Sequence, residues 1–322
     1  MSKKALRGVN LGGWLVLERW LSPRLFGTTD AVDEYTYCEQ QRDNFAALKS
    51  HRDTFVTETD FAWLTDHGIE AVRLPVGYWM FGDVKPYAPT VEYVDKAFIW
   101  AKKHDLKVLI DLHGAPMSQN GKKHSGRSGA TDWKPDETLD IITRIADRYG
   151  NHPALLGISL LNEPSPELSF KELEVFYARA YQAVRERCSD KTWVVFSDAF
   201  RPYHWWRKFR ATDYPGMTVD YHHYQIYGWL NQHLSIGMQL FRTKYLFPGK
   251  LRRMGRHHPL IVGEWCGAVS SKTKLTVEER QAYIKLQEKA FSNAAACFYW
   301  TYKTPYGSAW SYRHCVEQGW IV

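Results

Sequence analysis

The sequence GISLLNEPSPE, residues 157–167, begins as a buried strand and ends in polar residues. Its apolar half, GISLL, is typical of a parallel strand that is covered on both faces. Asn162 and Glu163 follow, and the next residue is a proline, which has no amide hydrogen to donate and therefore ends strand pairing. An Asn-Glu pair at the start of a loop is common in α/β proteins. The fragment alone therefore leaves open whether this is a structural turn or a functional strand end.

Similar apolar segments recur along the chain and alternate with amphipathic helical patterns. One such pattern is VTETDFAWLTDHG, in which Thr57 is a candidate helix N-cap. Eight alternating strands and helices predict a (β/α)8 TIM barrel, a single domain over residues 1–322, with a doubly wound open sheet as the alternative. The predicted strands cover residues 7–13, 71–76, 107–114, 154–163, 192–199, 217–224, 259–265 and 297–303.

The composition is that of a globular protein, with 44% hydrophobic and 24% charged residues among 322. Aromatic residues make up 15%, including 14 Trp and 19 Tyr, and such rings stack on flat apolar faces, of which the C–H faces of sugars are one example. The formal net charge of +7 favours anionic partners but says nothing about the fold or the reaction.

Five cysteines without CxxC spacing are expected to be reduced and mostly buried. The first residues, MSKKALRGVNLGGW, contain no apolar core of a signal peptide, and no apolar run is long enough for a membrane span. We therefore expect a cytoplasmic protein without a membrane partner, although a secreted chain trimmed of its leader would look the same. The oligomeric state is left open.

Polar side chains end nearly every predicted strand. In a parallel barrel the carboxyl ends of the strands meet around one mouth, where the active sites of this fold lie. A purely structural barrel has no need for ionisable groups at these positions, so we interpret Glu163 and Glu264 as functional. The strand-end residues are Arg73, His113, Asn162, Glu163, Asp198, His222, Tyr224, Glu264 and Trp300.

Two carboxylates that face each other across a pocket suit hydrolysis of a glycosidic bond. One must be protonated to donate to the leaving oxygen, and the other must be ionised to attack the anomeric carbon or to activate water. Burial raises the pKa of one carboxyl group, and a nearby cation keeps the other ionised. Arg73 is the candidate cation for Glu264, and Trp300 is a candidate floor for the sugar ring.

The ordered motifs VRLP, DLHG, LNEP, DYHHY, GEW and FYW resemble glycoside hydrolase family 5, whose members are retaining (β/α)8 enzymes. RGVNLGGWLVLE, DEYTYCE, LPVGYW and DLHGAPMSQNG are similar to its exo-β-1,3-glucanase branch, so the resemblance runs from Arg7 to about Trp310. It implies a β-1,3-glucanase or β-glucosidase that acts on β-glucans or β-glucosides and needs no cofactor.

The resemblance also implies a role for each matching residue. Glu163 would be the acid/base and Glu264 the nucleophile. The other residues would bind the sugar or position Glu264: Asn162 at the 2-hydroxyl, Arg73 and Tyr224 at Glu264, His113 and His222 along the same subsite, Trp300 under the ring, Glu18 at the non-reducing side, and Tyr227 as half of a clamp on the leaving sugar.

The chain departs from this pattern after SQNG, where Lys122, Lys123 and His124 replace an aromatic residue followed by acidic or amide residues. We expect these lysines to lie at the pocket mouth. The resemblance therefore implies the chemistry, while exo-action and glucose preference depend on these replaced positions. A glycosidase or transglycosylase acting on another β-glucoside, such as a glycolipid, is an alternative, and a carbohydrate-binding pseudo-enzyme is an alternative of another class.

Other features favour structural interpretations. The pairs HH at 222–223 and 257–258 lack the spacing of zinc sites, so no metal is expected. Cys266 has no paired base and is expected to be a core residue. The basic segment 241–258 carries no nucleic-acid motif and favours a solvated face with some packing rings, so no nucleic-acid partner is expected.

Overall fold

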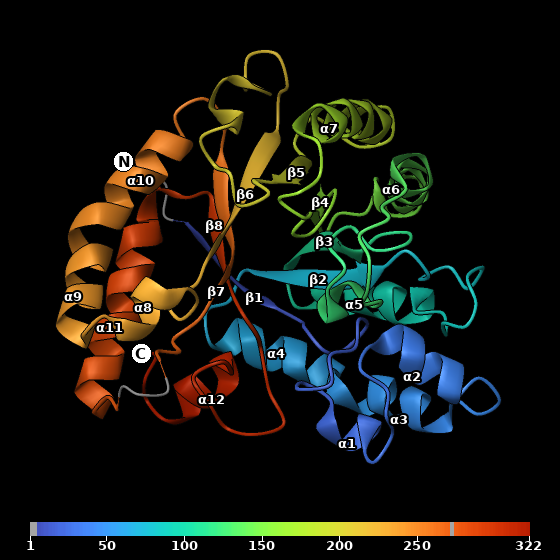
Figure 1. The fold of residues 1–322 in the computed structure, drawn as a ribbon, viewed down its shortest axis with the longest axis horizontal. Helices are drawn as coiled ribbons and strands as arrows, with labels where there is room; N and C mark the ends of the chain where they lie inside the picture. The colour runs from blue at the N-terminus through green and yellow to red at the C-terminus, as the bar shows by residue number, and fades with distance from the viewer. Residues whose placement is uncertain (1–4, 271–273) are drawn as a thin grey trace.

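The computed structural model describes residues 5–270 and 274–322. Eight parallel strands, each paired with the next and the last with the first, form a closed barrel at the centre of the molecule (Figure 1). This confirms the predicted (β/α)8 barrel and excludes the open sheet. The strands are β1 (Leu6–Asn10), β2 (Ala71–Gly77), β3 (Lys107–Gly114), β4 (Leu155–Ser159), β5 (Trp193–Ser197), β6 (Met217–His223), β7 (Leu260–Trp265) and β8 (Ala296–Tyr299).

The helices surround the barrel, with α6 and α7 on one side and α9, α10 and α11 on the other (Figure 1). The expected N-cap Thr57 begins α4, where its side chain and that of Asp60 form a capping box. The helices are α1 (Pro23–Phe26), α2 (Glu34–Gln40), α3 (Ala46–Phe55), α4 (Glu58–Asp66), α5 (Val91–Lys103), α6 (Pro135–Tyr149), α7 (Phe170–Arg185), α8 (Trp229–His233), α9 (Ile236–Phe241), α10 (Phe247–Met254), α11 (Val277–Ala290) and α12 (Tyr312–Glu317). Short helical turns are η1 (Lys123–Ser125), η2 (Trp205–Arg207), the π-helical η3 (Arg242–Leu246) and η4 (Phe291–Asn293).

The barrel interior changes from apolar to ionic along the strands. Side chains two residues apart point to the same side of a strand, so Ala71 and Arg73 share the interior, as do Leu109 and Asp111. A small apolar cluster that includes Ala71, Leu109 and Ile261 fills one layer. Arg73 and Asp111 lie one layer further towards the carboxyl ends and are fully buried. The ionic layer is therefore held on rigid strands.

Strand β4 ends earlier than the sequence predicts, at Ser159 rather than Glu163. Beyond it the chain bonds alternately to both neighbouring strands: the amide of Leu160 donates to the carbonyl of Val195, and that of Asn162 donates to the carbonyl of Leu112. Glu163 then adopts a left-handed backbone with φ of 40°. Its side chain is therefore aimed by a turn just beyond the strand and not by the strand itself.

Trp300 likewise lies one residue beyond β8. Among the helices in the described ranges, none has both the length and the apolar character needed to cross a membrane.

Candidate active site

A cavity of about 780 Å³ opens at the carboxyl ends of the strands. Six of the ten predicted site residues line it: Glu18, Glu163, Tyr224, Tyr227, Glu264 and Trp300. The other four, Arg73, His113, Asn162 and His222, are largely buried beneath it and bonded to one another or to the two glutamates. The structure thus brings together residues from six different strands or strand ends.

Arg73 is the central cation of the site. Its Nη1 lies 3.0 Å from Oε1 of Glu264 and its Nη2 lies 2.9 Å from Oδ1 of Asp111. Burial alone would lower the pKa of this guanidinium, but Asp111, Asp220 and Glu264 outweigh burial and raise it. Arg73 is therefore permanently charged, and it holds the carboxylate of Glu264 from the buried interior of the barrel.

A second chain of hydrogen bonds orients Asn162. Arg73 donates to its Oδ1 at 2.8 Å, and its Nδ2 lies 3.4 Å from Nε2 of His113. Nδ1 of His113 lies 2.7 Å from a carboxylate oxygen of Asp111, which favours the tautomer with the proton on Nδ1. Nε2 of His113 is then free to accept from Asn162, and the carboxamide is held in one orientation.

Glu264 is held on both oxygens, because Arg73 contacts Oε1 and the hydroxyl of Tyr224 donates to Oε2 at 2.8 Å. Burial and the nearby Glu264 raise the pKa of Tyr224 well above its ordinary value, so the phenol remains a donor. The preceding residue, Gly263, donates its amide to Oδ1 of Asp220 at 2.8 Å. A Cβ at Gly263 would lie 2.1 Å from that oxygen, so only glycine allows this close approach.

Glu163 is paired with His222 across a short hydrogen bond of 2.6 Å between Oε1 and Nδ1. Burial raises the pKa of Glu163, but the hydrogen bond and charge of His222 outweigh it and lower that pKa to about 2. Burial likewise lowers the pKa of His222, while Glu264, Asp220 and Glu163 raise it well above its ordinary value. Both directions place the shared proton on His222.

The carboxylates of Glu163 and Glu264 lie within 4.8 Å of one another, measured between one oxygen of each. A pair that forms a covalent glycosyl intermediate is about 5–5.5 Å apart, whereas a pair that admits a water molecule between sugar and base is about 6.5–9.5 Å apart. The oxygen–oxygen distance of at most 4.8 Å lies below both ranges, and it is therefore closer to the first arrangement than to the second.

Aromatic rings form one wall of the cavity. The ring of Trp310 lies 5.6 Å from those of both Trp20 and Tyr224, and 6.4 Å from that of Tyr227. Nε1 of Trp20 donates to Glu18 at 2.8 Å, and burial raises the pKa of that carboxyl group. Such a combination of rings and carboxylate suits sugar faces and hydroxyl groups.

Three basic side chains, Lys122, Lys123 and His124, line the same cavity. Both lysines are exposed and form no ion pair with any carboxylate that the structure describes, whereas Nε2 of His124 lies 3.7 Å from Oε2 of Glu163. The expectation that these lysines lie at the pocket mouth is therefore confirmed.

Glu163, His222 and Glu264 are close enough together to hold a metal ion. These side chains already form hydrogen bonds to protein groups, however: Nδ1 of His222 to Glu163, its Nε2 to Asp220 at 3.4 Å, and both oxygens of Glu264 to Arg73 and Tyr224. The three side chains are thus organised as a hydrogen-bond network.

Some residues of the site were not predicted. Asp111 and Asp220 anchor Arg73 from inside the barrel, and each stands two residues before a predicted histidine, in the patterns DLH and DYH. The two-residue period of a strand is the signal that could have identified them. Asn10 also accepts from Arg73, at 2.9 Å. Trp20 and Trp310 lie on loops, where no periodicity reveals them.

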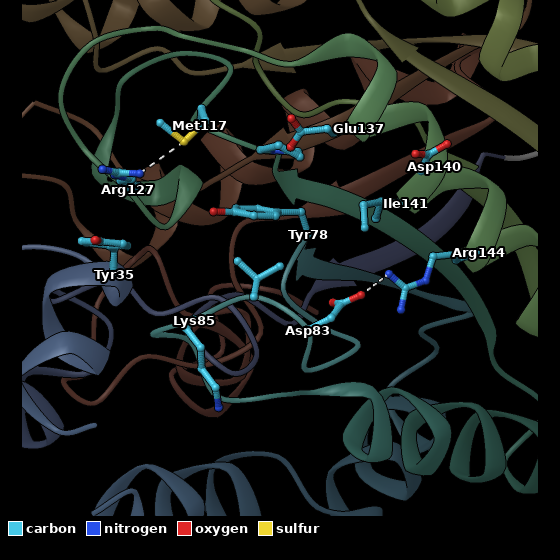
Figure 2. A pocket seen from close by; sticks show the side chains of 12 residues that line it. Tyr35, Tyr78, Asp83, Lys85, Met117, Arg127, Glu137, Asp140, Ile141 and Arg144 are labelled. Carbon is cyan, nitrogen blue, oxygen red and sulfur yellow. Dashed lines mark hydrogen bonds and ion pairs between the residues drawn. The ribbon is translucent and has the colours of Figure 1, made fainter. Parts of the chain in front are cut away.

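A second cavity, of about 420 Å³, is lined in part by the loop that follows β3 (Figure 2). Its lining includes Met117 and Arg127 of that loop, which contact each other at 3.3 Å, and the ion pair between Asp83 and Arg144 at 2.5 Å. The two cavities share no lining residue. The β3 loop therefore presents its lysines to the first cavity and Arg127 to the second.

Comparison with known proteins agrees with this geometry. The family model described as cellulase (glycosyl hydrolase family 5) matches residues 34–305. The chain is 36% identical to a probable glucan 1,3-beta-glucosidase A of Emericella nidulans, with 84% of this chain and 69% of that protein aligned. It is 33% identical to glucan 1,3-beta-glucosidase 1 of Schizosaccharomyces pombe, over 99% of this chain and 88% of that protein.

Solved structures share the fold at low sequence identity. The rutinosidase from Aspergillus niger superposes with a TM-score of 0.83 at 20% identity, covering 99% of this chain and 98% of that one. An endoglucanase from Thermotoga maritima superposes with a TM-score of 0.62 at 17% identity, and the match covers 95% of this chain and 91% of that one. The match of the family model over most of the chain and the identity to near full-length relatives confirm the expected family: this protein is a glycoside hydrolase and belongs to glycosyl hydrolase family 5.

Proposed function

We propose that the protein is a retaining β-glycosidase in which Glu264 is the nucleophile and Glu163 the acid/base. The observation that carries this proposal is the spacing of the two carboxylates, within 4.8 Å, above a buried arginine that binds only one of them. Arg73 and Tyr224 each donate a charge-assisted hydrogen bond to Glu264 and fix the orientation of its side chain. Glu163 is bonded instead to a proton donor, His222.

The reaction proceeds by double displacement. Glu264 attacks the anomeric carbon, the glycosidic bond breaks, and Glu163 gives a proton to the leaving oxygen. His222 supplies that proton across its 2.6 Å hydrogen bond. Water then attacks the glycosyl ester, Glu163 accepts its proton, and Glu264 leaves as a carboxylate, so that the product has the β-configuration of the substrate.

The remaining residues act on the sugar. Asn162 is held by Arg73 and His113 so that its carboxamide can bind the 2-hydroxyl group, and Trp300 provides the flat surface beneath the ring. Glu18 accepts hydrogen bonds from hydroxyls on the non-reducing side. Tyr227, which is 59% exposed at the rim, contacts the leaving group.

The substrate class that we propose is β-1,3-linked glucan or its oligosaccharides. The relatives named glucan 1,3-beta-glucosidase support this choice, as does the aromatic wall that Trp20, Trp310 and Tyr224 form. A second candidate is a β-glucoside with another leaving group. The specific observation in its favour is that Lys122 and Lys123 line the cavity, since an aromatic clamp on a neutral sugar has no use for cations.

Chemical rescue tests the assignment of the two glutamates. For Glu264→Ala we expect no hydrolysis, and with azide and an aryl glucoside that has a good leaving group we expect the α-glucosyl azide. Glu163→Ala is the matched variant: it still forms the glycosyl ester with such a substrate, and azide should give the β-glucosyl azide. If Glu264→Ala gave the β-azide and Glu163→Ala the α-azide, the nucleophile and the acid/base would be exchanged. Nearly full activity of either variant would show that the substituted glutamate is not catalytic.

Two measurements on the unsubstituted protein complete the test. NMR should show the β-anomer as the first product, whereas an initial α-product would exclude the retaining mechanism. Product analysis on β-1,3-, β-1,4- and β-1,6-linked glucans and on aryl glucosides identifies the substrate. Preference for the β-1,3 linkage supports the first candidate, and turnover of aryl glucosides alone supports the second.

A further inference from the structure

One outer surface of the molecule combines exposed apolar side chains with a helix that is anchored on its other face. The helical segment from α9 through η3 to α10, residues 236–254, lies beside α11 on the left of the barrel (Figure 1). Its inner face is buried and includes Gln239, Thr243, Leu251 and Met254. Thr243 accepts from Gln225 at 2.9 Å, which ties the segment to the barrel side.

The outer face of this segment is apolar in its first half. Met238, Phe241, Tyr245 and Leu246 are each about half exposed, and the rings of Phe241 and Tyr245 lie 5.0 Å apart, one helical turn from each other. Trp229 of α8 is 75% exposed, and α8 is joined to η3 by the hydrogen bond of 2.7 Å from Arg242 to Asn231. We call these five apolar residues together with the basic residues of the same segment the basic aromatic face.

The charge on this part of the chain is one-sided. Residues 221–263 contain six Lys and Arg and no Asp or Glu, while the whole chain has 42 of the former and 35 of the latter. The other residues, with 36 against 35, are close to neutral. Nearly all of the net positive charge of the chain therefore lies in this stretch.

Four cations within or just after this segment are exposed to solvent. Lys244, Arg252, Arg253 and Arg256 are exposed, and none of them forms an ion pair with a carboxylate within the described residues. The ammonium of Lys244 lies 4.9 Å from the ring centre of Tyr245, so cation and ring are presented together. An ordinary solvated face would intersperse both signs of charge and would not expose five large apolar side chains.

We propose that the basic aromatic face binds the surface of an anionic lipid bilayer. Rings and aliphatic side chains on one helix face enter the headgroup boundary, and Lys and Arg of the same helix bind lipid phosphates and carboxylates. Met238 and Leu246 favour this partner over a nucleic acid, which offers no apolar phase to aliphatic side chains.

One end of this surface lies close in the chain to a residue of the catalytic cavity. Tyr227 lines that cavity, and Trp229 follows two residues later in the chain. Docking would therefore hold the cavity rim near the bilayer surface, so the enzyme would reach glucosides that are attached to or held at a membrane. The lipid-binding proposal itself does not depend on the substrate or on the roles of the two glutamates.

The test is sedimentation of the full chain with vesicles of phosphatidylcholine alone or mixed with phosphatidylserine. We expect binding only to the mixed vesicles and weakening with added salt. Each Lys or Arg near such a surface contributes roughly fivefold in affinity, so Arg252→Gln with Arg253→Gln should weaken binding by about 25-fold. Exposed cations elsewhere, Arg42→Gln with Lys171→Gln, are the charge-matched control and should change binding much less.

A second pair of variants tests the apolar part. Phe241→Ser with Tyr245→Ser should weaken binding on the order of tenfold, since each exposed ring loses its apolar contact, whereas Ile99→Ser, at an equally exposed position of α5, should not. Turnover of a soluble aryl glucoside verifies that each variant is folded. Equal binding to both kinds of vesicle, or no effect of either pair, would refute the proposal. Salt-sensitive binding of DNA that needs the arginines but not the rings, with no vesicle binding, would assign the face to nucleic acid instead.

Discussion

The shared proton of Glu163 and His222 gives the sharpest test of the site. We consider His222→Asn, because the Asn amide nitrogen occupies nearly the position of Nδ1 but carries no positive charge and no acidic proton. In the native protein the pKa of Glu163 is lowered from 4.5 to about 2. This difference corresponds to about 3 kcal/mol of preferential stabilisation of the carboxylate.

The sign of the expected change follows from burial. Without the imidazolium, desolvation by burial remains and the pKa of Glu163 rises. The native pair keeps its proton until the pH passes the raised pKa of His222, whereas the variant loses its acid as the pH passes the pKa of Glu163 itself. The alkaline limb of kcat/KM should therefore move to lower pH by at least about one unit, which is about tenfold in rate at a fixed alkaline pH.

The assay compares two aryl glucosides. Phenyl glucoside needs protonation of its leaving group, and dinitrophenyl glucoside does not, so only the first should show the full displacement. This comparison also controls for the contact of His222 with Glu264, at 3.5 Å, which affects both substrates alike. His223→Asn is the matched control, since His223 is buried beside the site and its pKa is lowered, so it is neutral. An unchanged alkaline limb for phenyl glucoside in His222→Asn would refute the shared-proton reasoning.

The same pair affects stability. Because the folded-state pKa of Glu163 lies below its ordinary value, its contribution is complete above about pH 5 and is lost as the pH falls towards 2. Unfolding in urea should show that the native protein loses up to about 3 kcal/mol more over this interval than His222→Asn does. Parallel curves for the two proteins would contradict the assignment.

Three further substitutions test other contacts. Tyr224→Phe removes a charge-assisted hydrogen bond worth about 1.5–3 kcal/mol, so kcat/KM should fall by about 10- to 150-fold. Tyr306→Phe, at an exposed tyrosine that does not line the cavity, should stay near the parent value. Lys122→Phe should improve turnover of laminari-oligosaccharides more than that of an aryl glucoside, and equal effects would place Lys122 outside the leaving-group site. Gly263→Ala should lower the free energy of unfolding by about 1–3 kcal/mol in urea titration. Gly249→Ala, in helix α10 with open space around it, should instead leave it unchanged or raise it by up to about 1 kcal/mol.

The fold could be predicted because apolar runs and amphipathic helices alternate eight times, and each predicted strand overlaps an observed one. The strand ends could be named as site positions for the same reason, since a parallel barrel gathers them at one mouth. Prediction failed where the backbone leaves the regular ladder. The turn at Glu163, with its left-handed φ, results from hydrogen bonds to two different neighbouring strands, which only the closed barrel provides.

Loop residues were found only by analogy or not at all. Glu18 and Tyr227 came from the family resemblance, and Trp310 reaches the cavity through a loop whose path depends on its packing with Trp20 and Tyr224. The exposure of Phe241 was also unpredicted, because a ring in a helix is more often turned towards the core.

The charges beneath the sugar explain why the buried network suits this chemistry. Four carboxylates, Asp111, Asp220, Glu163 and Glu264, meet two cations, Arg73 and protonated His222. The net charge of this group is negative. Its side chains are held by the rigid barrel strands, so this charge is already in place before the substrate binds. Cleavage of a glycosidic bond develops positive charge at the anomeric carbon, and this negative charge stabilises it. Lys122 and Lys123 lie outside this layer, at the wet rim, where they can act on the leaving group without neutralising the charge that drives the reaction.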